Sequence, residues 1–265
     1  PFPEENITRR MWTKKSYSYR LWKTLEKLYL IESDVTVAMT RQFGEPFKQI
    51  SPQSIFVIIP NNVDVKNFIS NDKLRKSLRA ELRLNDDEII FAYSGSIGNH
   101  WNNPNIYAKF IIKLRELNIK HKFLFLTPNK MILKETFDKY NIKNDEYINI
   151  CVEFNNVPKY LSIADLGMNL MNKKDIRMSI KTCEYLAMGL PVITNLNVLG
   201  AKEIVDQYKV GLIIKDIENI NINEIETIIE QKEELSSKCR KVACEKFSNE
   251  KIVKKYIQIY KKLKD

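Results

Sequence analysis

From residue 88 onward, short apolar segments alternate with segments that have the residue spacing of amphipathic helices. The apolar segments include EIIFAYSG (88–95), HKFLFLT (121–127) and DLGMNLM (165–171). Continuous apolar runs are typical of parallel strands that are covered by helices on both faces. Six such strands alternating with helices predict a doubly wound parallel sheet, because crossover helices connect parallel neighbours. The predicted fold class is therefore α/β, with a Rossmann-like sheet.

The first part of the chain has a weaker version of the same pattern. Residues 16–31 place apolar side chains on one face of a helix, and short strands are expected within 33–40 and 54–60. The polar residues from 60 to 68 then predict a linker. A chain of 265 residues, of which 44% are hydrophobic, can form one large domain or two smaller ones.

Ligands of a doubly wound sheet bind outside the carboxyl ends of its strands. The first strand-end loop, YSGSIGNHW, contains Gly95 and Gly98, which allow the backbone to approach an anion closely, with amides and Ser96 as donors. This loop is neither G-x-G-x-x-G nor G-K-[ST], which argues against a nicotinamide dehydrogenase and a P-loop NTPase. The alternative is a plain turn between a strand and a helix.

Other catalytic patterns are missing from the sequence. The two histidines are His100, in the first strand-end loop, and His121, which begins a strand and is expected to be structural. There is no H-E-x-x-H motif or carboxylate cluster, and no G-x-S-x-G motif. The sequence therefore predicts neither a metal site nor a serine hydrolase.

The segment SIKTCEYLAMGLPVIT (179–194) predicts a short helix, a turn and a strand. Glu184 lies beside the apolar stripe of this helix, and Lys181 precedes it by one turn. One interpretation is a surface ion pair between residues i and i+3. The other is a ligand site, in which the carboxylate accepts hydrogen bonds from the two hydroxyls of a ribose and the ammonium and helix amides face phosphates.

Several segments together resemble a known family. YLSIADLGMNLM, SIKTCEYLAMGLPVIT and VGLII resemble the donor-binding domain of retaining GT-B glycosyltransferases of the large family 4 group. IIPNNVDVKNF is similar to the segment that enters this domain, and YSGSIGNHW is similar to a Y-S-G-S-[IL]-G-x-W variant of surface-polysaccharide glycosyltransferases. The resemblance covers about residues 30–250, and the segment around Glu184 is its most specific part.

The resemblance implies a binding site for a nucleotide diphosphate sugar. Glu184 matches the second glutamate of the family's E-x7-E motif, which binds the donor ribose. Residues 95–97 match the loop near the diphosphate, residues 153–157 the loop that borders the base, and residues 179–182 a segment close to diphosphate and sugar. The implied donor-binding residues are Gly95, Ser96, Ile97, Asn155, Val157, Arg177, Ser179, Lys181, Thr182 and Glu184. No catalytic residue and no metal ligand is assigned.

The sequence departs from the family pattern in two places. Ile176 stands where the first glutamate of E-x7-E is expected, and the R-x4-K that often follows the glycine loop is absent. Lys181, or Arg177 together with Lys173 or Lys174, is expected to supply the positive charge instead.

The resemblance also implies a domain organisation. Residues 1–59 look like the C-terminal remnant of an acceptor-binding domain, residues 60–247 form the donor-binding domain, and residues 248–265 form a terminal helix that crosses back to the first domain. The chain is then expected to be a fragment that is inactive alone.

The implied activity is that of a hexosyltransferase. It would move a sugar from a UDP- or GDP-linked donor to a glycan or lipid-linked acceptor in surface-polysaccharide biosynthesis, with retention of configuration and without a metal or other cofactor. Amides and basic side chains would stabilise the leaving diphosphate. An alternative is a nucleotide-sugar-binding subunit that needs a separate partner carrying the acceptor domain.

The net charge of +10 leaves two further partners to consider. A nucleic acid is not expected, because the lysines are spread over many helices without a basic–aromatic repeat. The lysine-rich side of the last predicted helix, 249–263, is expected to be a solvated face, with contact to an anionic membrane as the alternative. The four cysteines have no C-x-x-C spacing and predict reduced thiols. The expected location is the cytoplasm, with peripheral membrane contact as the alternative.

Overall fold

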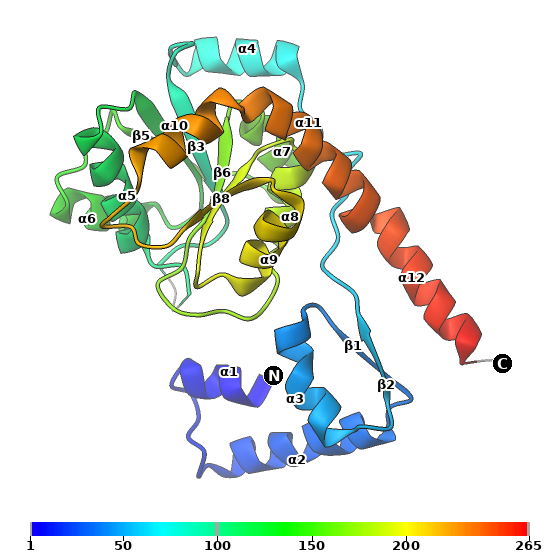
Figure 1. The fold of residues 1–265 in the computed structure, drawn as a ribbon. Coiled ribbons are helices and arrows are strands. Elements are labelled where there is room, and N and C mark those ends of the chain that lie inside the picture. The colour runs from blue at the N-terminus through cyan, green and yellow to red at the C-terminus, as the bar shows by residue number, and fades with distance from the viewer. Residues whose placement is uncertain (1, 99–100, 264–265) are drawn as a thin grey trace. The chain divides into compact units, whose positions relative to one another are not determined.

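The computed structural model describes residues 2–98 and 101–263. The chain divides into two compact units, a smaller one of residues 1–60 with 254–265 and a larger one of residues 61–253. The strands are β1 (Val35–Ala38), β2 (Ile55–Ile58), β3 (Ile89–Ser94), β4 (His121–Leu126), β5 (Tyr147–Ile150), β6 (Leu166–Asn169), β7 (Val192–Asn195) and β8 (Gly211–Ile214) (Figure 1).

Helices connect these strands. The α-helices are α1 (Phe2–Thr8), α2 (Tyr17–Glu32), α3 (Arg41–Ile50), α4 (Asp72–Glu81), α5 (Pro104–Glu116), α6 (Lys130–Lys139), α7 (Val157–Leu161), α8 (Ile180–Ala187), α9 (Leu199–Tyr208), α10 (Ile222–Glu230), α11 (Lys232–Val242) and α12 (Asn249–Lys262). A 3-10 turn, η1 (Phe154–Asn156), and a π-helical segment, η2 (Ala243–Phe247), complete the described elements. Within the described ranges, no helix combines the length and the apolar character needed to cross a bilayer.

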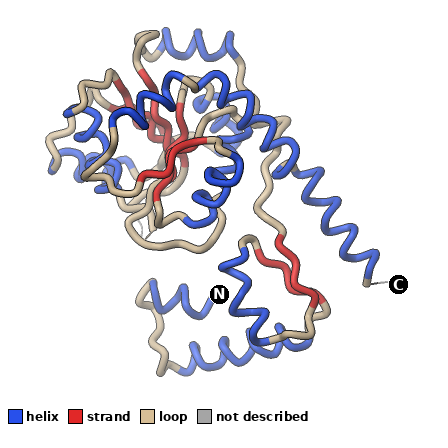
Figure 2. Tube along the Cα trace, viewed as in Figure 1, coloured by secondary structure: helices blue, strands red, loops and turns tan. Residues whose placement is uncertain are grey.

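The larger unit is built on a six-stranded sheet in the order β5-β4-β3-β6-β7-β8, and every neighbouring pair is parallel. Figure 2 shows these strands enclosed by helices. The prediction of an α/β fold with a doubly wound parallel sheet is therefore confirmed.

The strand order indicates where the candidate ligand site lies. From β3 the chain adds β4 and β5 on one side, and it then returns to add β6, β7 and β8 on the other side. The order reverses between β3 and β6, which pair through Phe91 and Leu166. Because loops diverge where the strand order reverses, ligands of such sheets typically bind at the carboxyl ends of the two strands that meet there. The loops after β3 and β6 are therefore the structural candidates.

The core of the larger unit is aromatic. Phe91 on β3 stacks on Phe123 of β4 with 5.2 Å between ring centres, and Phe110 of α5 meets both rings edge-on. Helix α5 begins as its sequence indicates, because the Asn103 side chain accepts a hydrogen bond from an amide of the first turn and Pro104 occupies the first turn. This packing makes β3 a rigid base for the loop that follows it.

Two helices were not predicted. Helix α4 has leucine at only two of its ten positions, so its apolar periodicity is too sparse to read from the sequence. It is held by charge instead, because the guanidinium groups of Arg75 and Arg79 reach Asp165, which precedes β6. Helix α1 is seven residues long and also lacks a clear period.

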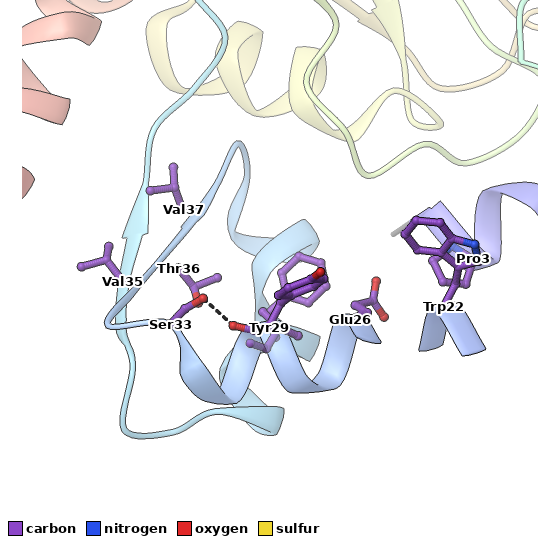
Figure 3. A pocket seen from close by; sticks show the side chains of 10 residues that line it. Pro3, Trp22, Glu26, Tyr29, Ser33, Val35, Thr36 and Val37 are labelled. Atoms are coloured by element: carbon purple, nitrogen blue, oxygen red, sulfur yellow. Dashed lines mark hydrogen bonds between the residues drawn. The ribbon is translucent and has the colours of Figure 1, made fainter. Parts of the chain in front are cut away.

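The smaller unit contains a two-stranded parallel sheet, β1 and β2, with α1, α2 and α3. An apolar cavity of about 400 Å³ lies between α2 and β1 (Figure 3). Trp22, Tyr29 and Val35 line it, with Glu26 as its charged member. None of the donor-binding residues implied by the sequence lines this cavity.

Candidate functional site

Helix α8 is fixed against the sheet by Tyr185. The Tyr185 hydroxyl accepts a hydrogen bond of 2.8 Å from the buried amide of Ser94, the last residue of β3. Its ring lies so close to Gly167 on β6 that a Cβ there would come within 2.4 Å of it. Because β6 carries a glycine at this point, α8 packs closely on the strand pair β3–β6. The N-terminus of α8 therefore lies at the mouth of the sheet.

Glu184 is buried in this helix, with 7% of its surface exposed. Among the described residues, its carboxylate makes no hydrogen bond and no ion pair. Burial raises the pKa of Glu184 to about 7, while the charge of Lys181 acts in the opposite direction. The Glu184 oxygens are not among the fully enclosed polar atoms of the described residues, so a ligand that brings hydrogen-bond donors can reach them.

Lys181 lies one turn before Glu184 but does not form the surface ion pair that was one interpretation of the sequence. Its ammonium lies over the ring of Tyr93, 4.0 Å from the ring centre. Burial lowers the pKa of Lys181 to about 7, and Glu184 opposes this shift. A Cβ at Gly95 would lie 3.6 Å from the Lys181 Nζ. The ammonium thus faces the first glycine of the loop after β3.

The loop after β3 has the backbone conformation that its glycines suggest. Gly95 and Gly98 have φ values of +121° and +87°, which L side chains rarely adopt. Ser96 Oγ and the Ile97 amide both donate to Asn129 Oδ1, at 2.9 and 3.1 Å. The Ile97 side chain is buried, so this residue serves the packing of the loop.

The first turn of α8 leaves backbone donors available. Ser179 is the N-cap, but its side chain makes no capping hydrogen bond. In the described part of the chain, the amides of Ile180 and Lys181 also make no hydrogen bond. Thr182 is fully buried, and its hydroxyl accepts a hydrogen bond of 3.0 Å from Asn169 at the end of β6. Thr182 therefore anchors the helix, and the uncapped amides are suited to binding an anion.

Arg177 is engaged with protein groups. Its guanidinium donates to both oxygens of Asp175, with Nε–Oδ1 and Nη2–Oδ2 distances of 2.9 Å. The same group lies over the ring of Trp101, 4.6 Å from the ring centre. The two candidate cations therefore have different partners: Arg177 is paired with Asp175, whereas Lys181 lies over the Tyr93 ring.

The remaining candidate residues lie on other elements or loops, or outside the described residues. Asn155 is exposed in η1, and Val157 begins α7. Neither residue forms a hydrogen bond or ion pair with α8 among the residues that the structure describes. Lys173 and Lys174 are exposed in the loop after β6. His100 lies outside the described residues. His121 is partly buried beside the Ile119 carbonyl, and burial lowers its pKa.

The structure therefore brings together Gly95, Ser179, Lys181 and Glu184 at the switch point of the sheet. Together they offer a carboxylate acceptor, an ammonium group and free amides, which suit a ribose joined to phosphates. Sequence reasoning missed Asn129, which holds the glycine loop, and Tyr93 and Tyr185, which hold Lys181 and α8. In the described residues, no group of three His, Cys, Asp or Glu side chains is placed to hold a metal ion.

Comparison with known proteins supports the fold. Residues 165–258 match the family model described as "Glucosyltransferase 3-like, C-terminal domain". No curated protein sequence matches the chain. The described site lies partly inside this matched segment, which contains all of α8.

Three solved structures are similar. Sucrose-phosphate synthase from Thermosynechococcus elongatus has 18% identity and a TM-score of 0.71, over 97% of this chain and 65% of that one. HepE from Anabaena, solved with UDP-glucose, has 17% identity and a TM-score of 0.72, over 95% and 69%. A glycosyltransferase from Rickettsia africae has 17% identity and a TM-score of 0.73, over 90% and 66%.

These similarities define the class of fold. The chain has the fold of GT-B glycosyltransferases, as the sequence resemblance implied, and it spans about two thirds of the length of these solved chains. More particularly, the segment from β6 to α12 is similar to the C-terminal domain of glucosyltransferase 3-like proteins.

Proposed function

We propose that this chain binds the nucleotide diphosphate sugar of a retaining, metal-independent glycosyltransferase. The single observation that carries the proposal is the buried Glu184 carboxylate, which has no hydrogen-bond partner among the described residues and lies one helical turn from Lys181. A vicinal diol supplies two hydroxyl donors to such an acceptor. A diphosphate supplies the negative charge that Lys181 and the free amides of α8 lack.

The same groups define a role in the reaction. When the bond between the sugar and the diphosphate breaks, negative charge grows on the leaving diphosphate. The Lys181 ammonium and the amides of Ile180 and Lys181 stabilise this charge from fixed positions. Of the two positions that the sequence left open for a cation, Lys181 is favoured, because Arg177 is already paired with Asp175.

The finer parts of the proposal rest on the sequence resemblance. The YSGSIGNHW loop supports a surface-polysaccharide glycosyltransferase with a glycan or lipid-linked acceptor and a UDP- or GDP-linked hexose. We assign donor binding to residues 60–247 and acceptor binding to a domain that includes residues 1–59. The lysines of α12 are compatible with peripheral contact with an anionic membrane at its cytoplasmic face.

A ligand screen by thermal shift tests donor binding. UDP-, GDP- and ADP-sugars are added separately, and one of them should raise the melting temperature, because a ligand at a hundred times its Kd stabilises the native state by about 2.7 kcal/mol. Lys181→Ala should then lose most of the affinity for the selected nucleotide in isothermal titration. If no nucleotide raises the melting temperature, the proposal is wrong.

Transfer is tested separately from binding. The selected donor, carrying a radiolabelled sugar, is incubated with glycan and lipid-linked acceptors, and the configuration of the new linkage is determined by NMR. An inverted linkage would contradict the retaining mechanism. Binding without any transfer would favour a nucleotide-sugar-binding subunit that acts with a partner.

A further inference from the structure

Asp175, Arg177 and Trp101 form a cluster at the mouth of the sheet that the proposed donor contacts do not use. We propose that this cluster, which we call the latch, positions the two sides of the anion site, namely the first turn of α8 and the glycine loop after β3. The inference rests on the proposed function, because it concerns how the diphosphate of the donor is held. The three residues come from two loops, the loop after β3 and the loop after β6.

In the latch, the Arg177 guanidinium is paired with the Asp175 carboxylate and lies over the Trp101 ring. Asp175 is buried and accepts hydrogen bonds from the Arg177 amide at 2.9 Å and from the Arg177 side chain. The face of the guanidinium lies on Trp101. This geometry needs a planar, bidentate cation, which is a property of arginine and not of lysine. The charge of Arg177 is already compensated, so we assign it a positioning role.

The loop after β7 supports the latch from the other side. The Asp175 amide donates to the Asn197 carbonyl at 2.7 Å, and the Leu199 amide donates to the Asp175 carbonyl at 3.0 Å. A Cβ at Gly200 would come within 2.8 Å of the Arg177 carbonyl oxygen, so α9 approaches the loop as closely as a glycine allows. Trp101 packs against the small apolar cluster of Met171, Val198 and Ala201. Asp175 is therefore held by backbone hydrogen bonds to Asn197 and Leu199.

The latch is connected along the chain to the first turn of α8 and to the glycine loop after β3. On one side, Arg177 precedes Ser179 by two residues, and the Ser179 side chain does not cap α8. The position of the free amides therefore depends on the loop that contains the latch. On the other side, Trp101 adjoins Asn102, whose carbonyl accepts a hydrogen bond of 2.7 Å from the Gly98 amide. This bond ties the glycine loop to the latch.

The test compares affinities for UDP and UMP, or for GDP and GMP if the wild type binds guanosine nucleotides. The ratio of the two Kd values measures how well the site holds the β-phosphate. Wild type should bind the diphosphate at least ~10-fold more tightly than the monophosphate. One charge-assisted hydrogen bond to the β-phosphate is enough for a difference of about this size. Trp101→Ala and Arg177→Lys should bring the ratio close to one, and Trp101→Phe should restore it. Lys139→Met, which removes an exposed charge from α6, should leave it unchanged.

The variants distinguish the latch from two alternatives: Arg177 binds phosphate directly, or the cluster is only structural. An unchanged ratio in Trp101→Ala overturns the proposal, even if Arg177→Lys lowers the ratio, because Arg177 would then bind phosphate directly. A parallel loss of affinity for both nucleotides with a lower melting temperature also overturns it, since the cluster would then be structural only. If Trp101→Ala does not fold, Trp101→Leu takes its place, because it also removes the aromatic plane: a ratio that stays at the wild-type value overturns the proposal. A wild type that binds no nucleotide refutes the proposed function itself, and the latch with it.

Discussion

The ammonium group of Lys181 lies 4.0 Å from the centre of the Tyr93 ring, and the Tyr93 hydroxyl donates a hydrogen bond of 2.7 Å to the Ser96 carbonyl. The Tyr93 side chain therefore connects Lys181 on α8 to the glycine loop. An aromatic face attracts a cation without neutralising it. Lys181 is thus oriented in the free site and keeps its capacity to bind an anion.

Glu184→Gln should weaken nucleotide binding and change how stability depends on pH. A neutral amide loses a charge-assisted hydrogen bond, which corresponds to a loss of ~10-fold or more in affinity. In the wild type, burial raises the Glu184 pKa from 4.5 to about 7. The native state therefore binds more protons than the unfolded state between these values, and stability falls as pH rises through this window. The variant lacks this fall, so its stability relative to wild type should increase by about 1–3 kcal/mol from pH 4 to pH 8.

Urea denaturation at the two pH values measures this difference, and isothermal titration measures the affinity. Glu135→Gln, an exposed position on α6, is the matched control and should change neither quantity. Loss of stability by Glu184→Gln at pH 8 would mean that the carboxylate serves a structural ion pair and not a ligand.

Nucleotide-sugar affinity should have a maximum near neutral pH. In the proposed site, binding requires a protonated Lys181 and an ionised Glu184, and burial brings both pKa values to about 7. As pH rises above 7, Lys181 loses its proton and the attraction to phosphate weakens. As pH falls below 7, Glu184 gains a proton and no longer accepts both ribose hydroxyls. Titrations between pH 5.5 and 9 with a nucleotide sugar measure the profile, because a free nucleotide has a terminal phosphate that itself titrates near pH 6.

Lys181→Arg separates the two limbs of this profile. Arginine stays charged at every pH in the range, so the alkaline decrease should disappear and the acidic decrease should remain. A wild-type profile that is flat from pH 6 to pH 9 would contradict the assignment of both residues.

The sequence predicted the sheet because several of its strands are apolar runs, as in β3 and β4 with the fully buried Phe91 and Phe123. It predicted the place of Glu184 and Lys181 because strand ends and helix starts follow from the same alternation. It could not predict α4, whose burial of Arg79 depends on the distant Asp165. Nor could it choose between Lys181 and Arg177, because the partners of Arg177 are Asp175 and a tryptophan 76 residues away. Such choices depend on contacts that form only when separate loops meet.

Tyr185→Phe should destabilise the larger unit by about 1–3 kcal/mol, because it leaves the buried Ser94 amide without its acceptor. The ring still fills the space against Gly167, so the effect comes from the hydroxyl alone. Chemical denaturation measures the loss, and Tyr208→Phe is the control, since the Tyr208 hydroxyl makes no hydrogen bond among the described residues. An equal effect of both substitutions would show that the bond to Ser94 contributes nothing specific.

Arg240→Met should destabilise the larger unit without a change in nucleotide affinity at temperatures where the variant is folded. The Arg240 guanidinium donates to the carbonyls of Ala187 and Val65, both at 2.6 Å, and also to that of Phe68. Ala187 ends α8, so Arg240 satisfies a free carbonyl at the C-terminus of the helix whose other end carries the candidate site. Loss of these charge-assisted bonds should cost about 2–4 kcal/mol, as measured by urea denaturation.

The neighbouring Lys241 gives the matched control for Arg240. It carries the same charge on the same helix but is exposed, so Lys241→Met should change stability by less than ~0.5 kcal/mol. Arg240→Lys should lie between the two, because an ammonium group keeps the charge but lacks the fork that reaches three carbonyls. If Arg240→Met instead lowers nucleotide affinity while its melting temperature is unchanged, the two ends of α8 are coupled, and Arg240 contributes to the orientation of Lys181 and Glu184.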